Sequence, residues 1–585
     1  MIDALFTSLR EIPVYKRLLK DIQVGLPLTG LGLPRATRLF VLAALYNDLK
    51  LPLLFVTDRS DRAVKILDEI QFWLPNAEFR IFPEPNPLFY EFASWGARTR
   101  RDRLQILTSL ADYHLPESSK RDNPVGLIAP VRAIMTRTLP RRDFIRTSRV
   151  IRISTKISPE KLLRSWVDIG YQYNEIVVGH GQFSKRGGIL DIWPPGETSP
   201  IRFEFFGTEI DTIRTFDPAT QRTIQNLERV LLTPAREILP GQAVGLDSEG
   251  KDLDEFYLPL VHPAKSSLLD YLPQDSLIMI DDFDNIQIAA DEIEYQAVKF
   301  RRESINEGLL AEDFPIPYTS WSELHDQISG MGTVELGSHA IEDKSDMAEL
   351  FTPGQRFAGR LKHFIDHVSE INVKGEEIYI VSRQIARLKE LWKGRYDISQ
   401  NNSRPTFIDG TLSDGWILSR PDGVRLNLIT DSEIFGWERP KPRQRRRPEV
   451  DAPEKAYADL IVHDWVVHMD YGIGRYEGLV NRTVDGAERE FLQVEYDAGD
   501  RLYVPIHQAD RLSRYIGTSS NHPRLTRLGT TQWNSIKSRV RESVREIAWD
   551  LLDLYAKRKQ AVGFAFSPDT TWQKDLESAF PYIET

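Results

Sequence analysis

The chain has 585 residues, of which 41% are hydrophobic and 10% aromatic, with no cysteine and a formal net charge of −10. This length suits roughly four packed domains, and the lack of cysteine excludes disulfides and thiolate metal sites. No apolar run reaches the roughly 20 residues of a membrane span, and the first residues lack the core of a secretory signal. The negative charge argues against a protein coated in nucleic acid. We expect a cytoplasmic, multidomain protein.

The first 135 residues alternate between helical and strand patterns. Apolar residues three and four apart predict helices, and short apolar runs beside proline predict buried strands. The predicted elements are helices 36–49 and 61–73, strands 53–56, 79–82 and 125–129, and a short helix from Val131. Alternating strands and helices predict a parallel sheet flanked by helices.

Residues 140–235 are richer in strand patterns and predict an inserted α+β domain. The two clearest strands are 189–193 and 201–206. Gly187 and Gly188 are interpreted as turn glycines. No second carboxylate or histidine lies near Asp191 in the sequence, so we expect a surface or capping role for it.

Residues 236–436 return to mixed structure, with a helix predicted near 288–302. Strands at 378–381 and 424–429 and a helix at 384–392 predict a second, smaller α/β domain. The next segment, WERPKPRQRRRP at 437–448, has three prolines and six basic residues and cannot build a core. We interpret it as a solvated linker; the alternative is transient phosphate contact through Arg443, Arg445, Arg446 and Arg447.

After the linker come short strands closed by turns, between 464 and 515. Leu492, Val494 and Tyr496 alternate with more polar residues, as in a half-buried strand, and Gly499 suits a reversal. Four or five strands in about 55 residues predict a small curled barrel. Beyond it, residues 531–560 carry one apolar stripe and predict a long helix.

Three separated segments resemble one family, the bacterial transcription-repair coupling factors (the Mfd family). Residues 179–223 resemble the module that this family shares with the excision-repair protein UvrB. ITDSEIFG at 429–436 is similar to the end of the family's small third domain. The predicted barrel resembles the RNA-polymerase-interaction domain shared with CarD-type regulators, and the similarity continues through VGFAF at 562–566 to FPYIET at 580–585.

The resemblance implies a fold and a set of domain boundaries. We expect a multidomain α/β and α+β protein with a degenerate RecA-like (UvrB-like) domain, a small α/β domain, a Tudor-like β-barrel and a long C-terminal helix. The expected segments are the UvrB-homology part (1–140), its inserted domain (141–235), its remainder (236–345), the small α/β domain (346–436), the basic linker (437–455), the barrel (456–520) and the long helix (521–585).

In the family, two arginines and a phenylalanine of the UvrB-like module bind UvrA. The matching positions here are Arg186, Arg202 and Phe206. Arginine offers a planar fork to carboxylates and the aromatic ring adds buried area, the composition of an interface hot spot. The alternative is that Arg202 lies on an exposed strand face and Phe206 belongs to the core.

For the barrel, the resemblance implies edge-to-edge strand contact with the polymerase β subunit. Our candidate edge is 480–483, that is Val480, Asn481, Arg482 and Thr483. Many family members carry an apolar residue near this position, so the contact here is partly polar or shifted by one residue. His463 and His468 lie five apart, which is not the spacing of a helical metal pair. We expect no metal site and a monomer.

UvrB carries a phosphate-binding loop near its N-terminus, and such a loop needs Gly-Lys-Ser/Thr. The corresponding segment here is GLGLPRAT at 30–37, where Pro34 also removes one amide donor. We identify no acidic Walker B motif either, and therefore no catalytic residues. The resemblance implies a scaffold, with ATP and magnesium needed only by a DNA-translocating motor that follows the FPYIET segment in the family. We expect the chain to be the front half of a longer protein.

Two other functions stay open at this point. One is a UvrB-type DNA-dependent ATPase with a degenerate loop, which ATP hydrolysis by this chain would support. The other is a separate CarD-like transcription regulator with a long N-terminal extension.

Overall fold

The computed structural model describes residues 2–25, 30–114, 124–218, 220–243, 254–337, 347–393, 405–436, 462–484, 487–505, 511–515, 524–528 and 533. The chain divides into two compact units, Met1–Arg445 and Arg446–Thr585, which are described separately below. None of the described helices is long and apolar enough to cross a membrane.

The first unit is built around a parallel sheet of five strands in the order β13-β12-β1-β3-β2. These strands are β1 (Leu53–Thr57), β2 (Phe79–Ile81), β3 (Gly126–Pro130), β12 (Leu277–Ile280) and β13 (Gly332–Glu335). Every residue of β1, β3 and β12 is buried. A strand that is covered on both faces has a continuous apolar sequence. This is why these strands could be predicted from apolar runs.

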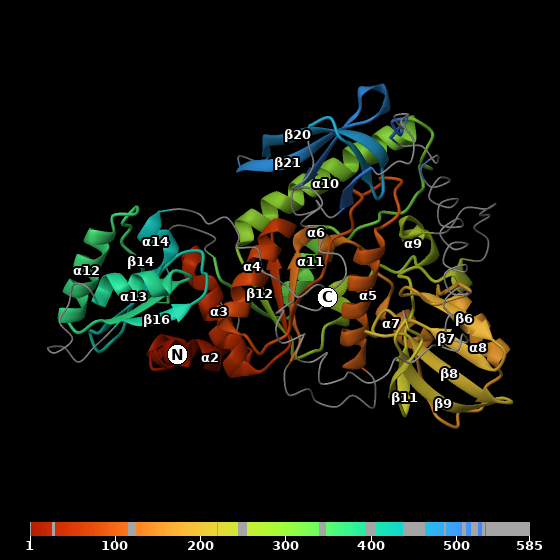
Figure 1. Cartoon of the computed structure of the whole chain (residues 1–585), viewed down its shortest axis with the longest axis horizontal. Helices are drawn as coiled ribbons and strands as arrows, with labels where there is room; N and C mark the ends of the chain where they lie inside the picture. Colours follow the sequence, from red (N-terminus) through yellow and green to blue (C-terminus); the bar gives the residue numbers. More distant parts are fainter. Residues whose placement is uncertain are drawn as a thin grey trace, which may run out of the picture. The chain divides into compact units, whose positions relative to one another are not determined.

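Helices cover both faces of this sheet (Figure 1). They are α1 (Ile2–Arg10), α2 (Pro13–Val24), α3 (Arg35–Leu49), α4 (Ser60–Trp73), α5 (Ala97–Asp112), α6 (Val131–Met135), α10 (Phe283–Asn306) and α11 (Trp321–Ser329). Successive residues of a strand point to opposite faces, so Leu54 and Val56 join one apolar core while Leu53 and Phe55 join the other. The sheet therefore separates two cores.

A second domain is inserted between α6 and α10. It begins with α7 (Arg141–Thr147), β4 (Arg149–Arg152) and α8 (Pro159–Asp168), and continues as β5 (Gln172–Tyr173), β6 (Gln182–Arg186), β7 (Ile189–Ile192), β8 (Ile201–Phe206), β9 (Glu209–Phe216), β10 (Thr223–Asn226) and β11 (Arg229–Leu232). Strands β5 to β10 form one six-stranded sheet in reverse chain order. Trp166 of α8 contacts the rings of Phe183 and Phe203, so α8 covers one face of that sheet.

The inserted domain enters and leaves through a two-stranded antiparallel ribbon, in which Arg149 of β4 pairs with Leu232 of β11. Beyond the ribbon, a fully buried ion pair joins Arg103 of α5 to Glu237, with Nε and Oε1 2.6 Å apart. Short turns of helix lead back to the parallel sheet: η1 (Pro240–Gln242), η2 (Glu255–Tyr257), α9 (Leu258–Val261) and η3 (Leu268–Tyr271).

The first unit ends in a smaller α/β domain with a mixed five-stranded sheet, in the order β14-β17-β18-β15-β16. Its elements are η4 (Ala348–Leu350), β14 (Phe351–Pro353), α12 (Leu361–Val373), β15 (Glu377–Ser382), α13 (Ile385–Lys393), β16 (Thr406–Asp409), β17 (Trp416–Ser419), β18 (Arg425–Thr430) and α14 (Asp431–Phe435). A capping box between Thr430 and Glu433 starts α14, and Gly436 ends it with φ +75°.

The second unit contains an antiparallel sheet in the order β22-β21-β20-β19-β23. Its elements are β19 (Trp465–His468), β20 (Gly472–Val484), β21 (Ala487–Glu495), η6 (Asp497–Gly499), β22 (Arg501–Pro505) and β23 (Leu512–Arg514). Leu492, Val494 and Tyr496 are buried in its small core, as their alternation predicts. The predicted reversal is also present, with Gly499 at φ +81°.

The prediction of a multidomain protein with α/β and α+β parts is confirmed, and most predicted strands and helices lie within one or two residues of the observed ones. The helix near 288–302 is longer than predicted, because α10 spans Phe283–Asn306. The Tudor-like barrel and the domain boundaries stay predictions. The predicted helix 531–560 falls outside the described residues, except for residue 533.

Candidate partner-binding sites

The three residues Arg186, Arg202 and Phe206, here called the arginine surface, lie in the six-stranded sheet of the inserted domain. On β8, Ile201 and Phe203 point into the apolar core, so Arg202 between them lies on the opposite face. Asp191 of β7 pairs directly with Arg202 across the two strands and shares that face. The sheet thus buries one face and presents a polar one.

Asp191 holds both arginines of this surface. Its Oδ1 accepts from Nε of Arg202 at 2.7 Å, and its Oδ2 accepts from Nη2 of Arg202 at 2.8 Å and from Nη2 of Arg186 at 2.6 Å. The Asp191 side chain is 1% exposed, against 12% for Arg202 and 47% for Arg186. The hydrogen bond to Asp191 raises the pKa of Arg202 further above its usual value.

The expected surface or capping role of Asp191 is therefore wrong. The arginines lie only 5 and 11 residues away in the sequence, but they belong to the neighbouring strands β6 and β8, and strand pairing determines that they face Asp191. The partners of Asp191 are two arginines and not a second carboxylate. Asp191 is therefore a fixed acceptor for hydrogen bonds and not half of an acid–base pair.

Two further residues support the arginines, and the sequence analysis did not identify either. Oε1 of Gln221 accepts from Nη2 of Arg202 at 2.8 Å and from Nη2 of Arg186 at 3.3 Å. The guanidinium carbon of Arg202 lies 4.3 Å from the centre of the Phe216 ring, within cation–π distance. Gln221 belongs to the turn between β9 and β10, a position that local sequence patterns do not connect to Arg186.

Phe206 is 84% exposed, so the alternative that it belongs to the core is wrong. The two-residue turn at Gly187 and Gly188, after Arg186, lies beside the end of β8, because the backbone N–H of Phe205 donates to the carbonyl of Gly188. Gly187 adopts φ +61°, which confirms its role as a turn glycine. An exposed aromatic ring on the same strand as Arg202, in a sheet that holds two guanidinium groups, is suited to a protein partner that carries carboxylates.

The second candidate surface is the edge at 480–483 in β20. Strand β20 pairs with β21 from Arg475 to Val484, a stretch here called the outer half of β20. Strand β19 pairs with β20 only from Gly472 to Arg475. In the described part of the sheet, the outer half of β20 therefore has one side without a paired strand, as edge-to-edge docking requires. The side chains of Asn481, Arg482 and Thr483 fall outside the described residues, so their role stays a prediction.

An apolar residue precedes this edge that the sequence analysis did not single out. Leu479 is 54% exposed, and Val462, which would contact a Cβ placed on Gly478, is 49% exposed. An apolar side chain next to an unpaired strand edge is a suitable anchor for an added strand.

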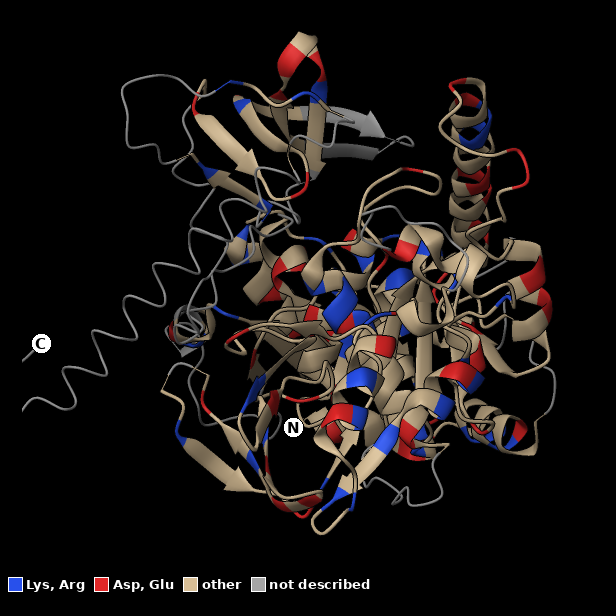
Figure 2. Cartoon of the chain, turned by 90° about the vertical axis from the view of Figure 1, so that its right-hand side faces the viewer, with Lys and Arg blue, Asp and Glu red and all other residues tan. Residues whose placement is uncertain are grey.

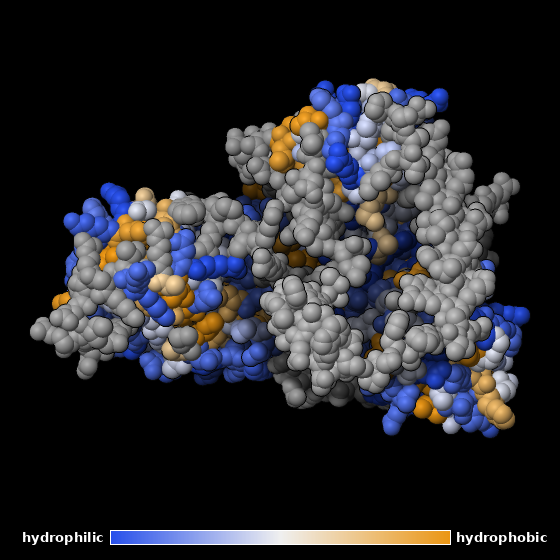
Figure 3. Space-filling view, viewed as in Figure 1, coloured by the Kyte–Doolittle hydropathy of each residue, from blue (hydrophilic) through white to orange (hydrophobic). Residues whose placement is uncertain are grey.

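The possible phosphate contacts Arg443, Arg445, Arg446 and Arg447 all fall in the linker, outside the described residues. Elsewhere, basic and acidic residues are interspersed rather than separated (Figure 2). On the face shown in Figure 3, hydrophobic residues of the described chain form small patches among hydrophilic ones. Among the exposed large hydrophobic side chains of the described residues, Phe206 has the largest exposed fraction, 84%.

The loop GLGLPRAT at 30–37 leads into α3, where a P-loop would hold phosphate. Two of its amides are engaged elsewhere: the N–H groups of Leu31 and Leu33 donate to the carbonyls of Glu335 and Leu336 at 2.9 and 2.8 Å. The Thr37 side chain is buried, and its hydroxyl donates to the carbonyl of Pro34. The loop therefore runs beside the end of β13, and the amides of Leu31 and Leu33 are not free to bind a phosphate.

Strand β12 is followed directly by two aspartates, Asp281 and Asp282, an acidic strand end of the kind that Walker B motifs have. Nη1 of Arg38 lies 3.1 Å from Asp281, its Nη2 lies 3.0 Å from Asp282, and Nε of Arg62 lies 2.9 Å from Asp281. Burial acts to raise the pKa of Asp281, but the two arginines outweigh it and the pKa is lowered.

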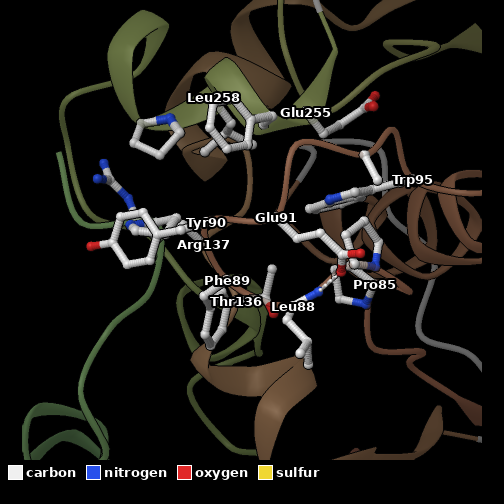
Figure 4. A pocket seen from close by; sticks show the side chains of 15 residues that line it. Pro85, Leu88, Phe89, Tyr90, Glu91, Trp95, Thr136, Arg137, Glu255 and Leu258 are labelled. Carbon is white, nitrogen blue, oxygen red and sulfur yellow. Dashed lines mark hydrogen bonds between the residues drawn. The ribbon is translucent and has the colours of Figure 1, made fainter. Parts of the chain in front are cut away.

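A shallow pocket lies between the loop at 85–95 and the segment 255–259 (Figure 4). Prolines and aromatic rings line most of it, and the Glu91 carboxylate accepts from the backbone N–H of Leu88 at 2.8 Å. Glu255 is paired with Arg236, and Arg137 donates to backbone carbonyls. These charged groups are engaged in structural contacts, so the pocket shows no acid–base pair.

Among the described residues, no cluster of three potential metal ligands occurs.

Comparison with known proteins matches two parts of the chain to families. Residues 150–238 match the UvrB interaction domain, and residues 460–516 match the CarD-like/TRCF RID domain. These ranges contain the arginine surface and the edge at 480–483, respectively.

Relatives named transcription-repair-coupling factor match nearly the whole chain. The protein of Bacillus subtilis (strain 168) is 27% identical over 638 residues, covering 100% of this chain and 53% of the relative. That of Staphylococcus aureus (strain MRSA252) is 27% identical over 608 residues, covering 94% of this chain and 50% of the relative. The chain thus spans about half the length of the curated relatives it matches.

Proposed function

We propose that this chain, which carries a UvrB interaction domain and a CarD-like/TRCF RID domain and is homologous to transcription-repair-coupling factors, is an adaptor in transcription-coupled nucleotide excision repair. It binds UvrA through the arginine surface and the β subunit of stalled RNA polymerase through the second unit. The adaptor acts as a monomer in the cytoplasm.

The observation that carries the proposal is the state of the arginine surface. A solvent-exposed Phe206 on the same strand as Arg202, together with two arginines fixed on one buried carboxylate, has the composition of an interface hot spot. At 84%, Phe206 has the largest exposed fraction among the exposed large hydrophobic side chains of the described residues. A partner surface that covers the ring and meets the guanidinium groups explains the arrangement.

For the polymerase contact, the proposal rests on the unpaired side of β20. The five strands around a core of Val466, Leu492 and Val494 curl into a small Tudor-like barrel, and its β20 edge accepts a strand of the β subunit. Val480 to Thr483 and the exposed Leu479 form the contact. The long helix expected at 531–560 follows this domain.

We further propose that this part of the protein neither binds nor hydrolyses ATP. The parallel sheet is a degenerate RecA-like domain whose loop amides bond to β13 and whose two aspartates bond to arginines. In the Mfd family, ATP, magnesium and translocation on DNA belong to the motor, and we assign none of them to these residues. A UvrB-type ATPase is the second candidate, favoured by the acidic end of β12, and it predicts hydrolysis by this chain.

The test is binding of the 585-residue chain to purified UvrA and, separately, to the N-terminal region of the polymerase β subunit. Arg202→Ala and Arg482→Glu are compared with the unmodified chain, so that each variant serves as the control for the other partner. ATP hydrolysis is measured in the same samples, with and without DNA.

We expect the unmodified chain to bind both partners, Arg202→Ala to lose only UvrA, and Arg482→Glu to lose only the β subunit. Failure of the unmodified chain to bind UvrA would overturn the adaptor proposal for the arginine surface. Hydrolysis of ATP that is lost on substitution of Asp282 would favour the ATPase.

A further inference from the structure

We propose that Asp191 and Gln221 are positioning residues that fix Arg186 and Arg202 for a partner surface presenting carboxylates beside an apolar pocket. The inference rests on the proposed function, because it concerns the same surface. It adds two residues that make no direct contact with the partner.

Asp191 sets the orientation of Arg202. Nε and Nη2 of Arg202 each donate to a different oxygen of the carboxylate, so the two groups form a bidentate pair. The Phe216 ring lies against the same guanidinium group. With the carboxylate 1% exposed and the arginine 12% exposed, solvent does not compete for these bonds. Arg202 is therefore held before any partner arrives.

Gln221 accepts hydrogen bonds from both arginines. Its single Oε1 accepts from both Nη2 atoms, while its own Nε2 donates to the carbonyl of Pro218 at 2.9 Å and fixes the carboxamide. Gln221 also has φ +59°, a conformation that L side chains rarely adopt. Glycine would suit that backbone better, so the glutamine side chain has a role that the turn itself does not require.

The groups left over define the partner. Nε and Nη1 of Arg186 and Nη1 of Arg202 form no hydrogen bond with any described residue. Two guanidinium charges against one carboxylate leave one positive charge on this face. The partner that fits is a protein surface with at least one carboxylate for Arg186 and an apolar pocket for Phe206. Fixing the arginines in advance lowers the entropy lost on binding.

The sharpest test is Gln221→Gly, which removes the carboxamide and relieves the positive φ in one change. We expect the unfolding temperature to stay the same or to rise, while affinity for UvrA falls about 3- to 10-fold. Glycine already occupies a turn position with positive φ elsewhere in the chain, at Gly423 of the small α/β domain (φ +84°), so the change to glycine is compatible with such a turn. A purely structural role of Gln221 predicts unchanged affinity.

The second test is a double-mutant cycle of Asp191→Asn with Arg202→Ala. The amide is similar in shape but accepts only through one oxygen, so we expect affinity for UvrA to fall about 10- to 100-fold. If Asp191 acts through Arg202, adding Asp191→Asn to Arg202→Ala changes affinity less than about 2-fold. Circular dichroism and thermal unfolding of each variant verify that the inserted domain is folded.

The outcomes separate this inference from the function it rests on. Loss of binding in Arg202→Ala together with unchanged affinity in Gln221→Gly and Asp191→Asn would overturn only the positioning roles. Additive effects in the cycle would do the same. If the unmodified chain failed to bind UvrA, both the function and the inference would be overturned.

Discussion

Two clusters in this molecule contain the same groups, two arginines on one buried aspartate, and differ in what they leave exposed. At the end of β12, Arg38 and Arg62 are 11% and 12% exposed and Asp281 is 7% exposed. In the inserted domain, Asp191 and Arg202 are buried to a similar degree, but Arg186 is 47% exposed and Phe206 lies in solvent. The first cluster is closed, and the second is open to a partner.

The difference shows why residue type alone does not identify a site. Arg38 is directed at two aspartates and at the carbonyl of Leu33, so its donors are engaged within the fold. A Cβ on Gly337 would come within 2.9 Å of its guanidinium group, which leaves little free space around it. Arg186, by contrast, uses one nitrogen, Nη2, in its hydrogen bonds to the described residues. The number of donors left unbonded, and their exposure, separates a structural cluster from an interface.

The largest expected effect comes from breaking the closed cluster with Asp281→Ala. Two buried arginines would lose their shared carboxylate, and an unpaired buried charge costs about 3–5 kcal/mol. We expect the free energy of unfolding to fall by that amount, measured with denaturant, while affinity for UvrA per folded molecule is unchanged. Asp291→Ala, on the exposed face of α10, is the control. A stable variant would show that Asp281 does not anchor the two helices.

A smaller effect, on binding and not on stability, is expected from Arg186→Ala in the open cluster. Because the side chain is half exposed, its loss should change stability by less than about 0.5 kcal/mol but weaken UvrA binding by about 2 kcal/mol. Calorimetry of binding and thermal unfolding measure the two quantities. Arg356→Ala, a more exposed arginine paired with Asp414, is the matched control and should bind normally.

Phe206→Ala sharpens the comparison further, because this ring has no counterpart in the closed cluster. We expect affinity for UvrA to fall by about 1–2 kcal/mol, with thermal stability unchanged since the ring is 84% exposed. Tyr295→Ala, which removes a 73% exposed ring from α10, is the control. Equal binding by both variants would mean that the phenylalanine is outside the interface.

The smallest effect concerns pH. The pKa of Asp281 is lowered in the folded protein, so its ion pairs stabilise the fold above the unfolded pKa of about 3.9. That stabilisation is lost as pH falls through the still lower folded pKa. We expect the unfolding free energy of the unmodified chain to decrease more steeply below about pH 4 than that of Asp281→Asn. Parallel curves would contradict the ion-pair assignment.

Much of the fold could be predicted because local patterns determine it. Buried strands such as β1 are continuous apolar runs, and α4 shows apolar residues at helical spacing. The family resemblance supplied Arg186, Arg202 and Phe206. Gln221 was not predicted because it reaches the arginines from a turn 19 residues beyond Arg202, which no local pattern indicates. Asp191 lies only 5 and 11 residues from Arg186 and Arg202, but its role depends on how their strands pair. The two aspartates that follow β12, by contrast, are a local pattern that the sequence itself shows.

The ribbon at the base of the inserted domain has a consequence for how this domain can be moved between proteins. Its first and last strands meet at Arg149 and Leu232, which are paired residues on neighbouring strands. A segment whose two ends are adjacent can be excised or grafted as a cassette without stretching the host chain. We therefore expect residues 149–232 to be exchangeable with an equivalent module, because the buried ion pair of Arg103 and Glu237 lies outside this segment and stays in the host chain.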